Sequence, residues 1–142
     1  MRYATVLKYM QPLNALGKDL LRQWLRKADG DLRVAERLAD APKDFDAVAF
    51  HCQQAVEKYW KARLAATGAD PPRACDLVRP LLLLEAVETF SGVESNMVRQ
   101  LTPFGVAIRY PSEEEEPPVA ELLAAARHFR DRLRPAIEAE LT

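Results

Sequence analysis

Residues 50–62, FHCQQAVEKYWKA, carry an apolar face and a polar face at helical spacing. Apolar side chains recur every three or four residues through this stretch and on both sides of it, as one face of an α-helix requires. They are Phe45, Val48, Ala49, Cys52, Val56, Tyr59 and Leu64. The sequence therefore predicts a helix that starts near Asp44 and ends before Gly68, where a C-terminal cap is expected.

The polar side chains of this helix have two interpretations. They are Gln53, Gln54, Glu57, Lys58 and Lys61. In the first, the face is solvated, and Glu57 and Lys61 form an i,i+4 ion pair worth a few tenths of a kcal/mol. In the second, the face belongs to an interface. Trp60 is expected at the margin of the apolar face, and an aromatic side chain beside polar ones is a common interface composition.

Four further apolar patterns with helical period flank this helix. They predict helices over about residues 13–38, 80–90, 91–108 and 119–137. Pro80 suits the first turn of the second of these, and Ser91 with Glu94 forms a capping box that opens the next. The acidic linker SEEEEPP, residues 112–118, separates the last helix from the others.

These patterns predict an all-α protein, an antiparallel up-and-down helical bundle of four to five helices. Only five glycines occur, and no stretch shows the period-two alternation of a half-buried strand. A chain of 142 residues is the size of one domain. We therefore expect a single domain over residues 1–142, with its core over about residues 13–138.

Composition limits the classes of partner and compartment. The net charge of -1 provides no global field toward nucleic acid or membrane, so any such site must be a local patch. Cys52 and Cys75 are expected to be free thiols in a reducing compartment. The run PLLLLEAV, residues 80–87, is too short to span a bilayer. We expect a cytoplasmic protein with no membrane partner.

The histidines and cysteines do not predict a metal or nucleophilic site. Their spacing matches no metal-binding motif, and no glycine-rich phosphate loop is present, so no metal and no cofactor is expected. His51 and Cys52 are adjacent on a helix and therefore do not face each other. Cys52 lies on the apolar stripe, where a buried core cysteine is expected.

Arginines on the last predicted helix form a candidate phosphate-contacting face. Arg127, Arg130 and Arg134 share one side of that helix and could bind phosphates of RNA. The alternative is a solvated face whose charge is neutralised by Asp131 and Glu138.

Four ordered segments resemble the HEPN family, the "higher eukaryotes and prokaryotes nucleotide-binding" domain. They are WLRKADGDLRVAERL at 24–38, DAVAFHCQQAVEKYWKARLAATG at 46–68, PPRACDLVRPLL at 71–82 and LTPFGVAIRYP at 101–111. The resemblance covers about residues 20–135. It implies a helical bundle that is usually a homodimer and often stands beside a small nucleotidyltransferase in a toxin–antitoxin pair. Many relatives are metal-independent ribonucleases with an Arg-x4–6-His motif.

This sequence departs from the ribonuclease motif at both histidines. Neither His51 nor His128 has an arginine four to seven residues upstream, and Cys75 stands where many relatives carry histidine. We therefore predict no catalytic residue. The resemblance implies a non-catalytic binding module that works with a nucleotidyltransferase-type protein, a nucleotide or RNA. The alternative is a metal-independent ribonuclease with a diverged active site.

The segment ending in Arg109 and Tyr110 supplies a prediction about the polar face. The resemblance places this segment near the central helix, and a guanidinium can hold a carboxylate through two parallel hydrogen bonds. Arg109 is therefore expected to pack toward Glu57. The predicted ligand or partner groove comprises Gln53, Gln54, Glu57, Lys61, Arg109 and Tyr110. The alternative places Arg109 on the surface, where it gains a little from the helix dipole.

A surplus of large apolar side chains predicts a homodimer. Trp24, Trp60, Phe104 and Tyr110, together with the leucine-rich third helix, exceed what one small bundle easily hides. Large exposed apolar patches usually mark interfaces.

Overall fold

The structure is a computed structural model that describes residues 12–40, 44–73, 77–105 and 116–142. Its described residues form five α-helices and one short 3₁₀-helix, with no strand. The helices are α2 (Ala15–Leu38), α3 (Phe45–Ala66), α4 (Val78–Leu84), α5 (Gly92–Leu101), η1 (Thr102–Phe104) and α6 (Val119–Ala139). The predicted all-α helical bundle is confirmed. The expectations for Cys75, Arg109 and Tyr110 fall outside the described residues.

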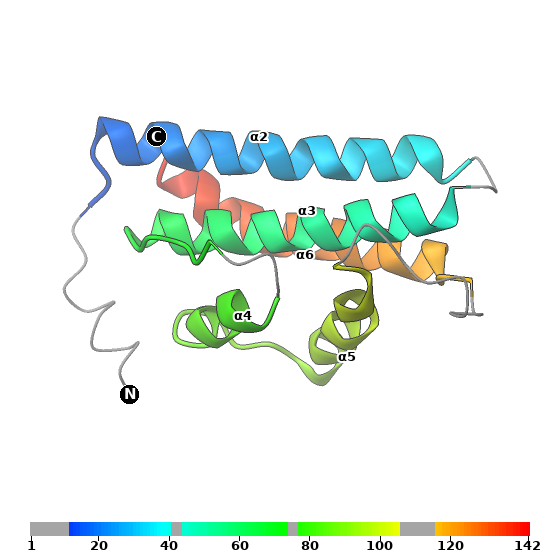
Figure 1. The fold of residues 1–142 in the computed structure, drawn as a ribbon. Helices are drawn as coiled ribbons and strands as arrows, with labels where there is room; N and C mark the ends of the chain where they lie inside the picture. The colour runs from blue at the N-terminus through cyan, green and yellow to red at the C-terminus, as the bar shows by residue number, and fades with distance from the viewer. Residues whose placement is uncertain (1–11, 41–43, 74–76, 106–115) are drawn as a thin grey trace.

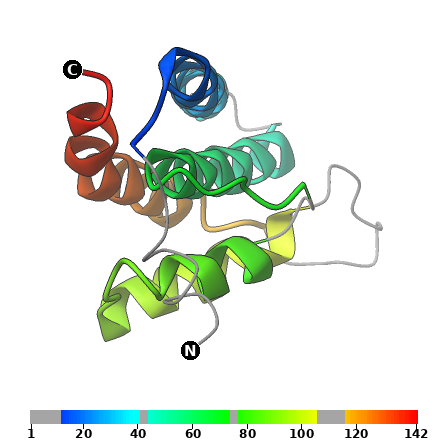
Figure 2. The same ribbon diagram turned by 90° about the vertical axis from the view of Figure 1, so that its left-hand side faces the viewer.

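The three long helices lie side by side, with α4 and α5 beneath them (Figures 1 and 2). α2 runs antiparallel to α3, and α6 runs in the same direction as α3 (Figure 1). Between α3 and α6 the chain passes first through α4 and then through α5, which lie near opposite ends of the long helices (Figure 1). The third member of the up-and-down bundle is thus two short helices instead of one long helix.

α3 is the central helix, and its neighbours bury it on nearly every side. The buried side chains include charged and amide groups as well as apolar ones. They are Val48, Ala49, Cys52, Gln53, Ala55, Val56, Glu57, Tyr59, Trp60, Lys61, Ala62, Leu64, Ala65 and Ala66. This explains why one apolar stripe does not account for α3. A helix with neighbours on nearly every side has little solvent-facing surface on which to place its polar residues.

Trp60 lies in the middle of the core, so the prediction that it sits at the margin of an apolar face is wrong. Its ring stacks on Phe90 at 5.9 Å and meets Phe129 edge-on at 5.4 Å. Such aromatic pairs contribute about 1 kcal/mol each beyond the area they bury. Trp60 and Phe104 are both buried within one copy of the chain, so neither belongs to the apolar surplus from which a dimer was expected.

Helix ends follow local signals, of which the Ser91–Glu94 capping box and Gly68 were predicted. Asn14 caps α2 by accepting a hydrogen bond from the Gly17 backbone N–H at 2.8 Å. The Ser91–Glu94 capping box is present in both directions at the start of α5. Gly68 has φ of 88°, a left-handed conformation that favours glycine, and it follows the end of α3 as predicted.

Two predicted helices end earlier than expected. α4 spans Val78–Leu84 instead of continuing from Pro80 to Phe90. The following residues are drawn to α6, because Arg132 donates to the Glu88 carboxylate at 2.8 Å and to the Thr89 carbonyl at 3.0 Å. α5 ends at Leu101 and passes into η1, because Pro103 cannot donate the next helical hydrogen bond.

The buried carboxylate of Glu94 fastens α5 to α6. It accepts from the Ser91 backbone N–H at 3.0 Å, lies 2.9 Å from His128 Nε2 and lies 3.3 Å from Arg132 Nε. Burial alone raises the pKa of this carboxyl group. The Ser91 N–H, His128 and Arg132 outweigh burial, so the pKa of Glu94 is held below its ordinary value.

We predict that Glu94→Gln lowers the free energy of unfolding by about 2 kcal/mol at neutral pH, because charge-assisted hydrogen bonds are lost. The folded pKa lies below the unfolded value of about 4.3, so this contribution is complete above that pH and is lost as pH falls through the folded pKa. Urea unfolding at neutral pH and at about pH 3 should show the difference shrinking. Glu140→Gln, at an exposed position, is the control. An equal difference at both pH values would contradict this role.

Candidate functional site

A groove of about 470 Å³ lies where α2, α3 and the segment after α3 meet. α2 contributes Leu20, Trp24 and Lys27, and α3 contributes Gln54, Glu57, Lys58 and Lys61. The third wall is the segment Asp70, Pro71, Pro72 and Arg73. Three of the side chains predicted for the ligand or partner groove, Gln54, Glu57 and Lys61, therefore line one cavity.

The polar row on α3 is buried, so the interpretation of this row as a solvated face is wrong. Gln53, Glu57 and Lys61 are only 1%, 2% and 3% exposed. Lys61 Nζ donates to Glu57 Oε1 at 2.8 Å, and Gln54 Nε2 donates to Gln53 Oε1 at 2.8 Å. Gln54 Nε2 also reaches Glu57 Oε2 at 3.4 Å. These contacts join the side chains of the row to one another across one, three and four positions.

Gln53 occupies the end of this row behind the groove. A Cβ atom added at Gly105 would lie 3.1 Å from Gln53 Nε2, so the absence of a side chain at Gly105 lets the chain after η1 approach the amide closely. The Gln53 side chain is thus covered by the backbone at Gly105 and does not line the groove, although the sequence predicted that it would.

Trp24 forms an aromatic wall of the groove. Lys61 Nζ lies 5.4 Å from the centre of its ring, within the range of a cation–π contact. The indole Nε1 is buried and has no hydrogen-bond partner among the described residues. A flat aromatic face next to ammonium groups can receive a planar, anionic ligand.

Cationic side chains outnumber carboxylates in the groove. Four lysines and arginines line it against two carboxylates, Glu57 and Asp70. Lys61 pairs with Glu57, and Lys58 pairs with Asp31 outside the groove. Lys27 and Arg73 are exposed, and neither forms an ion pair within the described residues. Asp70 also forms no ion pair within the described residues, so the unpaired groups of the groove carry one net positive charge.

Asp31 joins the groove to His51. Its two carboxylate oxygens contact His51 Nδ1, at 2.9 Å, and Lys58 Nζ. Both partners come from α3, whereas Asp31 comes from α2. The arrangement orients the His51 ring and leaves its Nε2 atom pointing away from that contact.

The predicted arginine face on α6 carries compensating carboxylates. Arg127 lies 3.5 Å from Glu36, and Arg130 lies 2.8 Å from Asp131. Arg134 lies 3.1 Å from Glu138 and also pairs with Asp29. The three side chains share one side of α6, but each already contacts an acid. They lie on a different part of the molecule from the α2–α3 groove.

The histidines and Cys52 do not come together as a nucleophilic pair. Cys52 is fully buried, and burial raises the pKa of its thiol to about 12. His51 pairs with Asp31, and His128 pairs with Glu94 on the other side of α3. No group of three or more potential metal ligands occurs in the described part of the chain. None of the helices described there is long and apolar enough to cross a membrane.

Sequence reasoning missed the groove residues that lie outside α3. Trp24 and Lys27 are three residues apart on α2, and this spacing was a usable signal. Asp31 belongs to the ADGDL segment, residues 28–32, in which Asp29 and Asp31 reach different partners. Arg73 could not be assigned, because its place in the groove depends on how the segment after α3 folds back.

Comparison with protein families gives a match to the HEPN domain over residues 21–135, most of the chain. Comparison with curated proteins and with solved structures gives no match.

We predict that Lys61→Met lowers the free energy of unfolding by about 3 kcal/mol, because it leaves the buried Glu57 carboxylate without its ammonium partner. Glu57→Gln combined with Lys61→Met should restore much of the loss. Lys58→Met on the same helix removes a partly exposed pair and should cost less than about 1 kcal/mol. Urea unfolding followed by circular dichroism measures all three. Equal losses for the two single variants would show that burial of the Glu57–Lys61 pair has no special importance.

Proposed function

The chain belongs to the HEPN domain family, and from this we propose that it is a non-catalytic binding module for a nucleotide or RNA. The proposed site is the α2–α3 groove. The observation that carries the proposal is the combination of an aromatic wall, Trp24, with rim cations Lys27 and Arg73 that have no ion pair within the described residues.

The chemistry of the groove supports a phosphate-bearing ligand. Lysine and arginine bind phosphate through charge, and base stacking on aromatic side chains tolerates any base. The volume of about 470 Å³ lies in the ordinary range for small-ligand sites. The buried Glu57–Lys61 pair gives the groove a rigid floor, because both side chains are fixed before any ligand arrives.

The arginine face on α6 supports this proposal less well. Arg127, Arg130 and Arg134 would have to leave Glu36, Asp131 and Glu138 to bind phosphate. Lys27 and Arg73 have no such contact to break within the described residues. We therefore place phosphate recognition in the α2–α3 groove.

A second candidate function is metal-independent ribonuclease activity with a diverged site. The observation that favours it is His51, whose Nδ1 is held by Asp31 beside Lys58 at the edge of the groove. An oriented imidazole is a suitable proton carrier near neutral pH. The proposed setting for either function is a cytoplasmic, toxin–antitoxin-like pair with a nucleotidyltransferase-type protein, and it rests on the family resemblance.

We predict that Lys27→Ala and Arg73→Ala each weaken binding of ATP and of a short fluorescein-labelled single-stranded RNA. The salt dependence of RNA binding should fall by about one unit of slope for each lost phosphate contact. Fluorescence anisotropy at several salt concentrations measures the RNA arm, and calorimetry measures the ATP arm. Arg26→Ala, an exposed arginine on α2 that does not line the groove, is the matched control. Absence of binding by the wild type, or equal loss in the control, would refute the proposed site.

Cleavage assays separate the two candidate functions. Without metal, the wild-type chain is expected to leave single-stranded RNA intact, and His51→Ala and His128→Ala are expected to change nothing. Wild-type cleavage that disappears in His51→Ala but persists in His128→Ala would select the ribonuclease, with His51 as its proton carrier. The binding assay above supplies the check that His51→Ala remains folded and able to bind.

A further inference from the structure

The α2–α3 groove has ring-bearing side chains on both walls beside α3. Trp24 belongs to α2, and Pro71 and Pro72 belong to the segment that turns back along α3 (Figure 1). A nucleic-acid base stacks on an aromatic face, and proline rings offer an apolar surface to its other face. A base that enters between these walls directs one edge toward α3, so the side chains of α3 decide which base fits.

Gln54 leaves an unused hydrogen-bond acceptor at the groove. Its amide nitrogen donates to Gln53 Oε1 at 2.8 Å and reaches Glu57 Oε2 at 3.4 Å. Because a carboxylate only accepts hydrogen bonds, the contact with Glu57 determines which end of the amide faces that residue. Gln54 Oε1 therefore points away from both partners, and it accepts no hydrogen bond within the described residues.

Glu57 and Lys58 add a second acceptor and a donor to this wall. Glu57 Oε1 accepts from Lys61 at 2.8 Å, whereas within the described residues Oε2 has only the longer contact with Gln54. Lys58 gives one of its three N–H donors to Asp31 and keeps two for other acceptors. Residues three and four positions apart are neighbours on a helix. Positions 54, 57 and 58 therefore offer the groove two acceptors and a donor within one turn.

We propose that this groove selects guanine, an inference that rests on the nucleotide or RNA binding proposed above. Guanine carries two adjacent donors on one edge, the 2-amino group and N1–H, with the acceptor O6 beside them. The 2-amino group donates to Gln54 Oε1, N1–H donates to Glu57 Oε2, and O6 accepts from Lys58. The phosphates extend to the rim cations Lys27 and Arg73.

The other bases present edges that do not match this wall. Adenine and cytosine place a ring nitrogen with a lone pair beside their amino group, and that lone pair would face the Glu57 carboxylate. Uracil has one N–H between two carbonyl oxygens, one of which would face Gln54 Oε1. Each mismatch leaves polar groups of the groove unpaired, which weakens binding. Hypoxanthine keeps N1–H and O6 but lacks the 2-amino group, so it isolates the contact with Gln54.

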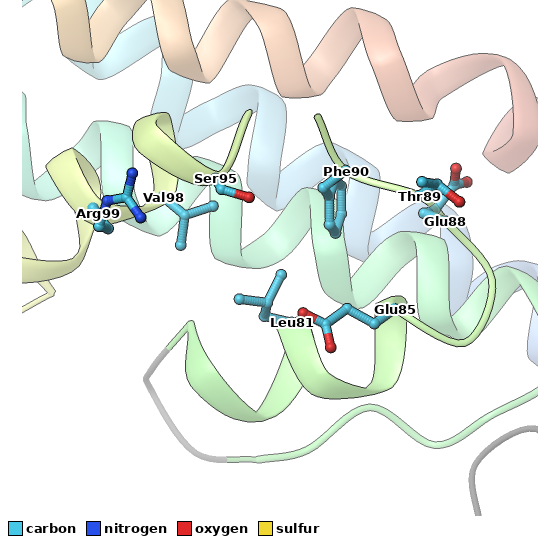
Figure 3. A pocket seen from close by; sticks show the side chains of 8 residues that line it. All are labelled: Leu81, Glu85, Glu88, Thr89, Phe90, Ser95, Val98 and Arg99. Carbon is cyan, nitrogen blue, oxygen red and sulfur yellow. The ribbon is translucent and has the colours of Figure 1, made fainter. Parts of the chain in front are cut away.

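The groove between α4 and α5 does not offer this combination. It has a volume of about 420 Å³, and Leu81, Phe90 and Val98 point into it (Figure 3). Phe90 is already stacked on Trp60, and Glu88 is held by two arginines, each at 2.8 Å. The described residues that line this groove include no lysine and no amide side chain. Guanine recognition is therefore assigned to the α2–α3 groove.

Ligands that differ by single groups test the assignment on the wild-type chain. Calorimetry should show that GTP binds about tenfold more tightly than ITP, its hypoxanthine counterpart, because one hydrogen bond is lost. ATP should bind about a hundredfold more weakly than GTP, because its edge opposes a charged acceptor. A labelled uridine tract with one guanosine, compared by anisotropy with the same tract carrying inosine, repeats the test for RNA. Preference in the first assay alone identifies a free nucleotide as the ligand, and preference in the second alone identifies RNA.

Two variants assign the contacts to their side chains. Gln54→Leu should bring the affinity for GTP down to that for ITP, while unchanged ITP binding shows that the groove is intact. Lys58→Met removes the donor to O6, which both nucleotides carry, and should weaken both equally. Gln100→Leu is the matched control, since Gln100 also donates its amide to a carboxylate, that of Glu121, but does not line the groove.

The outcomes separate this inference from the function on which it rests. Equal binding of GTP and ITP by the wild-type chain, with equal binding of the two RNA tracts, would overturn guanine selection but leave nucleotide or RNA binding in place. A preference for GTP over ITP that persists in Gln54→Leu would also overturn the proposed contact. If no nucleotide and no RNA binds, the proposed function itself fails.

Discussion

The enclosure of α3 on nearly every side is the constraint on which the rest of the structure depends. A helix with neighbours on nearly all sides must bury whatever its sequence places on each side, and α3 carries a carboxylate and an ammonium group. Burying either alone is costly, whereas the Glu57–Lys61 contact at 2.8 Å compensates both charges within one helical turn. Gln54 continues these contacts toward the start of the helix by donating to Glu57 and to Gln53. The wall of the groove is therefore fixed by the requirements of folding before any ligand binds.

Two aspartates on α2 connect the long helices through different partners. Asp29 accepts from Tyr59 on α3 and from Arg134 on α6, whereas Asp31 holds His51 and Lys58 on α3. They are two positions apart, so they leave α2 in different directions on either side of its buried face. Burial and the contact with Asp29 raise the pKa of Tyr59, which stays a hydrogen-bond donor. Asp31 holds Lys58 at the edge of the groove, and Asp29 holds Arg134 and so fastens α6 to α2.

Much of the fold could be predicted from the sequence, because its signals are local. Helical period identified the long helices, and the Ser91–Glu94 capping box and Gly68 marked two boundaries. Trp60 was misplaced because a single apolar stripe was assumed for a helix that has neighbours on nearly every side. The early end of α4 depends on Arg132, more than forty positions away, which no local pattern contains. The groove was predicted only in part, because its walls come from three segments. Of these, only α3 has polar side chains in a pattern that indicated a site.

The close approach at Gly105 ties two distant positions in the sequence to each other. One methyl group there would press on the amide of Gln53, and that amide is already held by Gln54. Alanine at 105 therefore requires the Gln53 amide to shift by a few tenths of an ångström, or a shorter side chain at position 53. The two sites should drift as a pair over evolutionary time, so that a family alignment would record the contact as correlated substitution although neither residue faces the groove.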